Sequence, residues 1–211
     1  MINCDVTACG VITRAAEVKK KDDESTFISF SIKIDLKGRD GSEFPLFINV
    51  SSKGGESDIA QFSKGKKVTV HGRLKFRQKG DKLYLNLRAS EDIELSDSEK
   101  EVKIEGKISF WGKIGAKGVG TFLDKKNRNY KSFSAFSQTK EGENNEFLWF
   151  RFMYFHPKKE DDSILVANKY VEIHGDLQLS SYNSKLSTDC RVESVKEWIL
   201  KKNQQESKTS A

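Results

Sequence analysis

The sequence has few residues that cross-link or interrupt a chain. Its 211 residues include 2 prolines and 3 cysteines. Cys4, Cys9 and Cys190 form no Cys-x-x-Cys pair, so they lack the common structural zinc spacing and argue against a disulfide scaffold. We expect three reduced cysteines in a cytoplasmic protein.

Long apolar segments are absent as well. No stretch approaches the roughly 18 consecutive apolar residues of a membrane-spanning helix. The first residues, Met1–Asp5, show no basic region followed by an apolar run, which is the pattern of a signal peptide. We therefore expect a soluble, cytoplasmic protein with no membrane partner.

Side chains that build catalytic or metal centres are sparse. The 3 histidines show no ligand spacing. The segment Gly112–Gly120 is rich in glycine but lacks the Gly-Lys-Ser/Thr ending of a phosphate-binding loop, so we interpret it as a flexible loop. Asp22–Glu24 and Asp161–Asp162 are interpreted as solvated loop charges rather than a two-metal centre. We expect no enzymatic activity, no cofactor and no metal site.

Charge, in contrast, is plentiful. The chain has 37 Lys and Arg against 31 Asp and Glu, which gives a net charge of +6 and a pI near 9.0. A scattered excess of this size says little about partners, whereas clustered cations favour a polyanion. The local arrangement of the cations therefore carries the argument.

The clearest cluster is Lys66–Ala89, which alternates between apolar and polar residues. Successive strand side chains point to opposite faces, so this pattern predicts a β-hairpin that turns near Gly80. Its apolar face would hold Val68, Val70, Gly72, Leu74, Phe76, Leu83, Leu85, Leu87 and Ala89. Its outer face would present Arg73, Lys75, Arg77, Lys79, Lys82 and Arg88 around Tyr84. Such a face suits a phosphate backbone, with one ring left for a base. A solvated strand face gives the same alternation, so the hairpin alone does not decide.

The segments before the hairpin predict a small barrel. Alternating residues indicate strands near Val6–Ile12, Phe27–Ile34 and Phe44–Val50, and Ser57–Ser63 has room for a short helix. With the hairpin, the order is three strands, a helix and two strands. This is the order of the five-stranded OB barrel.

The pattern then occurs a second time. His71 matches His174 at an offset of 103 residues (174 − 71), and the opening glycines Gly10 and Gly106 differ by 96 (106 − 10). This comparison predicts about seven additional residues in Lys113–Gly120. The offset of 103 pairs Phe30 with Phe133, Phe44 with Phe147, Phe47 with Phe150, Val68 with Val171, Gly72 with Gly175, Leu74 with Leu177, Leu83 with Leu186 and Arg88 with Arg191.

A repeat of this length indicates two copies of one domain rather than a solenoid, whose unit is about 20–50 residues. We predict an all-β protein of two tandem five-stranded OB barrels, each with a short helix between its third and fourth strands. The expected boundaries are residues 1–97 and 98–202, joined by an acidic linker at Ser96–Glu101, with a flexible tail over residues 203–211.

Two segments carry a recognisable pattern, Phe44–Val50 (FPLFINV) and Asp58–Leu74 (DIAQFSKGKKVTVHGRL). They resemble the bacterial single-stranded DNA-binding protein (SSB) family. In that family a third strand, a short helix and a fourth strand of pattern KG-x-x-V-x-V-x-G-x-L follow one another at this spacing. The resemblance covers Phe27–Leu95 well and Tyr130–Val195 more weakly, because Asn168-Lys169 stands where Lys-Gly is expected.

The resemblance implies how the chain would bind DNA. Members stack bases on aromatic residues of the second and third strands, which points to Phe44 and Phe147, and Arg151 stands where a basic contact is expected. Most members have one barrel per chain and assemble as tetramers, so a two-barrel chain would reach four barrels as a homodimer. The acidic tail of the family has no counterpart in Lys201–Ala211, which hints at a specialised or element-borne protein.

The two halves differ in charge. Thr69, His71, Arg73 and Lys75 of the first fourth strand become Glu172, His174, Asp176 and Gln178 in the second. The second half is therefore either a base-stacking platform or a surface for dimerisation. The strand phases place six phenylalanines inward: Phe30, Phe47, Phe62, Phe76, Phe133 and Phe150. They place six other rings outward: Phe27, Phe44, Tyr84, Tyr130, Phe147 and Trp149.

We therefore expect a non-enzymatic protein that binds single-stranded DNA with little sequence preference, in replication, repair, recombination or mobile-element transfer. An RNA-binding OB protein and an interaction module without nucleic-acid binding are the alternatives. The expected DNA-binding residues are Phe27, Lys33, Phe44, Arg73, Lys75, Arg77, Lys79, Lys82, Tyr84, Arg88, Tyr130, Phe147, Trp149 and Arg151.

Overall fold

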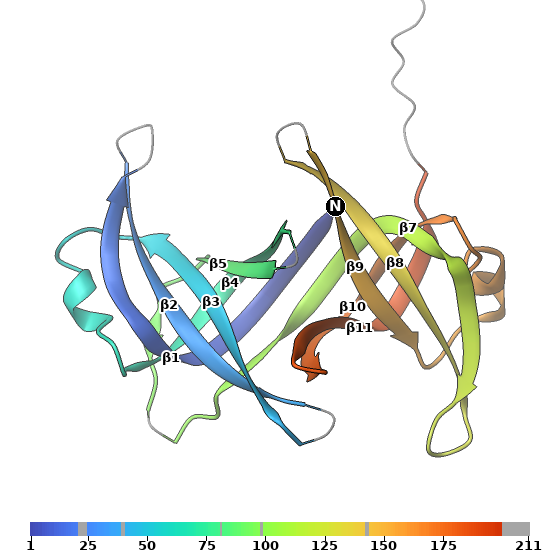
Figure 1. Ribbon diagram of the computed structural model, residues 1–211, viewed down its shortest axis with the longest axis horizontal. Coiled ribbons are helices and arrows are strands. Elements are labelled where there is room, and N and C mark those ends of the chain that lie inside the picture. Colours follow the sequence, from blue (N-terminus) through green and yellow to red (C-terminus); the bar gives the residue numbers. More distant parts are fainter. Residues whose placement is uncertain (21–24, 39–40, 81, 98, 142–143, 200–211) are drawn as a thin grey trace, which may run out of the picture.

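The computed structural model describes residues 1–20, 25–38, 41–80, 82–97, 99–141 and 144–199. The described chain is all-β (Figure 1). Its strands are β1 (Ile2–Lys20), β2 (Thr26–Lys37), β3 (Glu43–Lys53), β4 (Lys67–Lys79), β5 (Lys82–Ala89), β6 (Glu94–Leu95), β7 (Lys103–Leu123), β8 (Asn129–Glu141), β9 (Asn144–Tyr154), β10 (Tyr170–Tyr182) and β11 (Lys185–Glu197). No helix in this part of the chain has the length and apolar character needed to cross a membrane.

The strands close into two barrels that lie side by side (Figure 1). Barrel 1 runs β1-β2-β3-β5-β4 and returns to β1, and barrel 2 runs β7-β8-β9-β11-β10 and returns to β7. Within each barrel the neighbours are antiparallel except β3–β5 and β9–β11, which are parallel. This is the expected tandem arrangement of two five-stranded barrels.

The prediction of a short α-helix between the third and fourth strands of each barrel is wrong. The described chain has 3₁₀ turns at these two places, η1 (Ile59–Gln61) and η2 (Lys159–Ser163). The Ser57–Ser63 segment lies between Gly54-Gly55 and Gly65, which leaves too few residues to repay the nucleation of an α-helix. Asp161, Lys158 and Tyr154 fix the second turn, because the Asp161 carboxylate accepts hydrogen bonds from the Tyr154 hydroxyl and the Lys158 amide.

Strands β1 and β7 join the barrels into one sheet. They pair antiparallel from Ile2 with Phe110 to Cys9 with Lys103. The backbones come so close at Gly106 that a Cβ there would lie 2.2 Å from the Asp5 carbonyl oxygen. Near the centre of this seam Asp5 faces Lys107, and each is paired with a residue of its own barrel: Arg73 lies 3.8 Å from Asp5, and Lys107 donates to Asp176 at 2.6 Å.

Two further contacts brace the barrels. Phe76 of β4 packs edge-on against Phe150 in the core of barrel 2, with ring centroids 5.3 Å apart. On the other side a β-bridge links Gly38, beyond β2, to Ser181 of β10. Each barrel therefore places a hairpin against a strand of the other.

The predicted loop at Gly112–Gly120 is wrong, because these residues belong to β7. Val68 pairs with Gly10 and its repeat Val171 pairs with Gly112, so Gly10 corresponds to Gly112 at an offset of 102 (112 − 10). The expected match of Gly10 with Gly106 and the insertion of about seven residues are therefore wrong. A β-bulge between Ile114 and Val119 shifts the register of β7 against β8.

The repeat is also displaced by one residue in the third strand. Phe30 pairs with Val50 and its repeat Phe133 pairs with Phe152, so β3 matches β9 at an offset of 102 (152 − 50). A shift of one residue exchanges the two faces of a strand. Phe47, expected in the core, is 56% exposed and matches Trp149 rather than Phe150.

The outward orientation predicted for Phe44 is wrong as well. Phe44 shares one face of β3 with the buried residues Leu46 and Ile48, and it packs half-buried against the core. The other inward phenylalanines are correct: Phe30, Phe62, Phe133 and Phe150 are buried and Phe76 is partly buried. Asp22–Glu24 and the predicted tail over residues 203–211 lie outside the described residues.

Candidate nucleic-acid interface

The β4–β5 hairpin of barrel 1 carries a cationic outer face. Its cross-strand pairs are Arg73 with Arg88, Lys75 with Asn86, Arg77 with Tyr84 and Lys79 with Lys82. The six cations and Tyr84 are exposed, whereas Val70, Leu74, Leu85 and Leu87 are buried beneath them. The faces predicted for this hairpin are confirmed. We call these six cations and Tyr84 the basic face.

Neutral amides continue the basic face onto β3. The Asn49 amide donates to the Asn86 side chain at 3.4 Å, and Ser31 donates to Asn49 at 3.0 Å. Asn49, Asn86, Tyr84, Arg77 and Lys79 line a hollow of about 290 Å³ on this face. The hollow thus combines two cations, one ring and two amides.

In barrel 1, the expected cations Lys33 and Arg73 are engaged in exposed ion pairs. Lys33 of β2 lies 2.9 Å from Asp35, and Arg73 lies 3.8 Å from Asp5. Both pairs are exposed, so water and salt screen them. They leave the guanidinium and ammonium groups within reach of another anion.

The same rows in barrel 2 are nearly neutral. The equivalents are Asp176 with Arg191, Gln178 with Asp189, Ser180 with Ser187 and Tyr182 with Lys185. Lys107 of β7 donates to Asp176 at 2.6 Å and also to Glu193. Barrel 2 therefore has no basic face on its hairpin.

Arg151, expected to contact phosphate, is held inside the surface of barrel 2. Its guanidinium donates two hydrogen bonds to the Asp189 carboxylate, at 3.0 and 2.7 Å. The Asp189 side chain is 4% exposed and the Arg151 side chain 35%. The pair occupies the position of Asn49 and Asn86 in barrel 1, so an ion pair replaces an amide pair.

Barrel 2 instead exposes aromatic rings. Phe147 and Trp149 of β9 are 47% and 51% exposed. Phe136 of β8 joins them, with its ring centroid 5.4 Å from that of Phe147 and 4.9 Å from that of Trp149. We call Phe136, Phe147 and Trp149 the ring cluster.

Phe136 was missed in the sequence. Phe136 shares the outward face of β8 with Ser134 and Gln138. At the repeat offset of 103 (136 − 33) it takes the place of Lys33. That substitution of a ring for a cation, next to two rings on β9, is the signal that could have revealed it.

A second set of rings lies at the other end of the same strands. Tyr130 of β8 stacks on Phe155, with centroids 5.1 Å apart and planes 23° from parallel. The Arg191 guanidinium lies 5.2 Å from the Phe155 centroid. Phe122 of β7 contacts Tyr130 at 5.7 Å. Tyr130, expected to contact DNA, is therefore half-buried in a stack formed by the protein itself.

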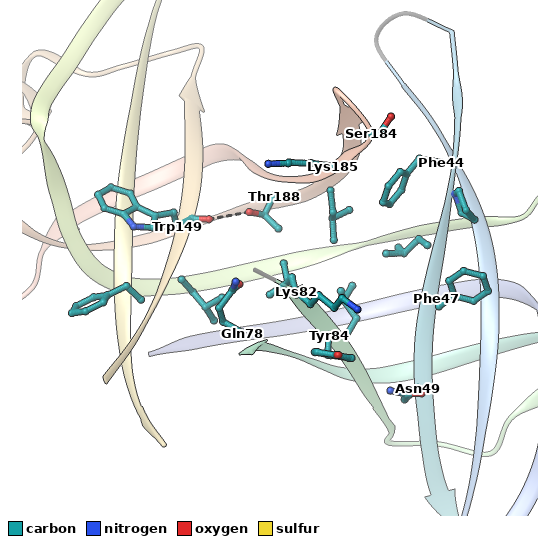
Figure 2. A pocket seen from close by; sticks show the side chains of 17 residues that line it. Phe44, Phe47, Asn49, Gln78, Lys82, Tyr84, Trp149, Ser184, Lys185 and Thr188 are labelled. Carbon is teal, nitrogen blue, oxygen red and sulfur yellow. Dashed lines mark hydrogen bonds between the residues drawn. The ribbon is translucent and has the colours of Figure 1, made fainter. Parts of the chain in front are cut away.

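Part of the basic face, Lys82 and Tyr84, and part of the ring cluster, Phe147 and Trp149, border one cleft between the barrels. This cleft of about 940 Å³ is lined by Phe47 and Tyr84 from barrel 1 and by Phe147 and Trp149 from barrel 2, with Lys82 between them. Figure 2 shows Trp149 on one side, Phe44 and Phe47 on the other, and Lys82 and Tyr84 between the two sides. Thr188 of β11 donates to the Trp149 carbonyl at 2.9 Å and ties β9 to β11.

The two histidines at the same repeat position, His71 and His174, form hydrogen bonds within their own barrels. His71 lies 2.8 Å from the Thr7 hydroxyl, and its repeat His174 lies 2.9 Å from the Ser109 hydroxyl. His174 also bonds Glu172 at 2.8 Å, and this hydrogen bond lowers the pKa of the Glu172 carboxyl. Burial raises the pKa of the Cys4 thiol to about 12, which keeps it protonated.

The described residues contain no group of three or more His, Cys, Asp or Glu side chains placed to hold a metal ion. What the surface offers is fixed cations, exposed rings and amides. This set of groups can bind a charged, flexible chain that carries planar bases.

No model of a known protein family matches the chain, and no curated protein matches it either. Solved structures do. The wild-type single-stranded DNA-binding protein from Thermus aquaticus matches with a TM-score of 0.50 and 15% identity, over 95% of this chain and 95% of that one. The Plasmodium falciparum SSB in complex with ssDNA matches 50% of this chain with a TM-score of 0.36 and 17% identity.

The Thermus match spans both barrels, because it covers nearly all of each chain. This protein shares the fold of the Thermus aquaticus single-stranded DNA-binding protein. At 15% identity the likeness concerns the fold, so the argument for function rests on the surface of this chain.

Proposed function

We propose that the protein binds single-stranded DNA without catalysis and with little sequence preference. The observation that carries this proposal is the cleft at which Lys82 and Tyr84 of the basic face meet the exposed rings of Phe147 and Trp149, with the other five cations of barrel 1 on the same hairpin as Lys82. Cations neutralise phosphates of any sequence, and every base has a face that can stack on a ring. Its fold is also that of a protein named for binding single-stranded DNA.

The two barrels contribute different interactions. Arg73, Lys75, Arg77, Lys79, Lys82 and Arg88 bind phosphates electrostatically. Phe47, Tyr84, Phe147 and Trp149 stack bases along the cleft, each worth about 1–3 kcal/mol where a base is bound. Arg151 orders barrel 2 through Asp189 rather than contacting the strand.

A titration of tryptophan fluorescence with single-stranded DNA tests this function. We expect quenching by an oligonucleotide of about 30 nucleotides, because stacking on exposed Trp149 changes its surroundings. Affinity should fall with salt with a log–log slope of about −4, since each phosphate contact on a single strand contributes about −0.7. The matched duplex is the control. Equal binding of duplex, or no binding in either fluorescence or a gel shift, contradicts the proposal.

The ion-paired hairpin face of barrel 2 supports a second candidate, an interaction module. On that reading the ring cluster would bury itself against protein, including a second copy in a homodimer of four barrels. Light scattering with and without the oligonucleotide separates the two, because a DNA-binding role leaves the rings accessible. A matched RNA oligonucleotide in the same titration tests the RNA-binding alternative.

The domain boundaries are part of the proposal. We propose residues 1–97 and 98–202 as the two domains. The β1–β7 seam would hold them together, so either half expressed alone would expose a strand edge.

A further inference from the structure

Barrel 2 contains a three-layer stack that its own residues complete. Phe155 directly follows β9, which lies between β8 and β11 in the sheet. Its ring stacks on Tyr130 from β8 at 5.1 Å and meets the Arg191 guanidinium from β11 at 5.2 Å. A planar group is thus held between an aromatic ring and a guanidinium.

Barrel 1 retains the two outer layers but not the middle one. Phe27 corresponds to Tyr130 and Arg88 to Arg191, both at an offset of 103 (130 − 27; 191 − 88). The third strands match at 102, so the partner of Phe27 across β2–β3, Lys53, stands where barrel 2 has Phe155 (155 − 53). The pairing of Ser51 with Arg88, repeated as Met153 with Arg191, fixes the same register on β5 and β11.

The structure has a groove at this position. A cavity of about 470 Å³ is lined by Phe27, Ser51, Lys53, Arg88 and Ser90, with Glu91 and Asp92 at one side. Its volume is in the range of small-molecule sites, roughly 300–1,000 Å³. Lys53 and Arg88 are exposed, so a ligand can reach both.

We propose that this groove binds one nucleobase in the place that the Phe155 ring takes in barrel 2. The base stacks on Phe27 and lies under the Arg88 guanidinium, in the geometry that Tyr130, Phe155 and Arg191 display. The Lys53 ammonium binds the adjoining phosphate. Glu91 and Asp92 repel phosphate, so the backbone runs along the Lys53 side.

This inference rests on the proposed binding of single-stranded DNA and adds a subsite outside the cleft between the barrels. In barrel 2 the Phe155 ring occupies the place that we propose for the base, and it shows that a flat ring fits between the Tyr130 ring and the Arg191 guanidinium. The same repeat position then serves packing in barrel 2 and recognition in barrel 1. The two halves differ there in one side chain, Phe155 in barrel 2 and Lys53 beside the groove in barrel 1.

The test is to fill the groove. Lys53→Phe should supply the missing ring and exclude the base, and Phe27→Leu should remove its platform. Lys53→Gln is the matched control, because it removes the same charge without adding a ring. The full-length chain is titrated with single-stranded oligonucleotides of about 12 nucleotides that carry 2-aminopurine at one position in turn, and thermal melting confirms that each variant is folded.

We expect one position in the wild-type complex whose 2-aminopurine fluorescence is quenched by stacking, with that quenching lost in Lys53→Phe and Phe27→Leu and kept in Lys53→Gln. Affinity should fall about five- to hundredfold in Phe27→Leu and about fivefold near 0.1 M salt in Lys53→Gln. Lys53→Phe loses both the charge and the base, so its affinity should fall by about the product of the two, roughly 25- to 500-fold. Unchanged quenching in Lys53→Phe, or equal losses in Lys53→Phe and Lys53→Gln, overturns the subsite while leaving DNA binding intact. No binding by the wild-type chain overturns both.

Discussion

The β4–β5 and β10–β11 hairpins are the same structure with opposite surfaces. Arg73 faces Arg88 in the first, and Asp176 faces Arg191 in the second. The buried rows beneath them are alike, with Gly72 and Gly175 each accommodating a carbonyl oxygen of the neighbouring strand. The core positions of the two hairpins are alike, whereas the outward positions carry six cations in barrel 1 and nearly neutral rows in barrel 2, whose exposed rings Phe147 and Trp149 lie on β9 instead.

The difference teaches how one chain can bind in two ways. Coulombic attraction acts at distance and is weakened by salt, while stacking acts only in contact and is much less sensitive to salt. Under the proposed function, barrel 1 would provide the first through the basic face and barrel 2 the second through the ring cluster. The following variants separate the two contributions.

Removing charge from barrel 1 should have the largest effect. Arg73→Gln, Lys75→Gln and Arg77→Gln together remove three phosphate contacts. The affinity for single-stranded DNA should fall on the order of a hundredfold at about 0.1 M salt, measured by fluorescence anisotropy. The matched control removes three exposed lysines from barrel 2: Lys125→Gln, Lys126→Gln and Lys159→Gln. Equal losses in both triple variants would mean that overall charge, not the hairpin, governs binding.

Removing rings from barrel 2 should have the next largest effect on binding. Phe147→Ala with Trp149→Ala should cost about 1–3 kcal/mol for each base that stacks there. Phe47→Ala is the matched change at the equivalent position of barrel 1, and it should cost less because Phe47 lies outside the ring cluster. Anisotropy at high salt is the measurement. A larger loss for Phe47→Ala would reverse the assignment of roles.

The ion pair of barrel 2 can be converted into the amide pair of barrel 1. Arg151→Asn alone leaves the nearly buried Asp189 carboxylate without its cation and should lower the free energy of unfolding by about 1–3 kcal/mol. Adding Asp189→Asn recreates the Asn49–Asn86 arrangement and should restore most of that stability in urea unfolding. If the double variant also lost most of its DNA affinity, Arg151 would be a phosphate contact after all.

The smallest effect concerns His174, which occupies the same repeat position as His71. Glu172 holds His174, and the equivalent residue beside His71 is Thr69. Because the folded-state pKa of Glu172 is lowered, its contribution is present above the unfolded-state pKa and disappears as pH falls through the folded value. Glu172→Gln should therefore lower stability by less than about 0.5 kcal/mol at pH 7, and this loss should shrink as the pH falls below the unfolded-state pKa of the carboxyl. Urea unfolding at several pH values checks this, and a loss that grew in acid would contradict it.

Much of the fold could be predicted because strands show a period of two. The alternation in Lys66–Ala89 identified the basic face, and the repeated glycines and histidines identified the second barrel. Register could not be predicted in the same way. Phe44 and Phe47 have the same spacing as Phe147 and Phe150, yet the cross-strand pairs of Phe30 and Phe133 set an offset one residue shorter.

That one-residue difference decided which rings face solvent, and it is a tertiary property. The bulge in β7, which contains Gly115 and Gly118, is likewise fixed by pairing with β8. The Arg151–Asp189 pair and the Phe155 stack join residues far apart in sequence, so no local pattern announces them. Sequence indicated the kinds of side chain, and the closed barrels determined which of them meet.

The most direct test of the account is the salt dependence of binding in three proteins. Dissociation constants for the same single-stranded oligonucleotide are measured from low to high salt for the wild type, the triple hairpin variant and the Phe147→Ala, Trp149→Ala variant. The account predicts that the hairpin variant loses about 2 units of the log–log slope, while the ring variant keeps the wild-type slope and is weaker at every salt concentration. Equal slopes in all three proteins would contradict the division of charge and stacking between the two barrels.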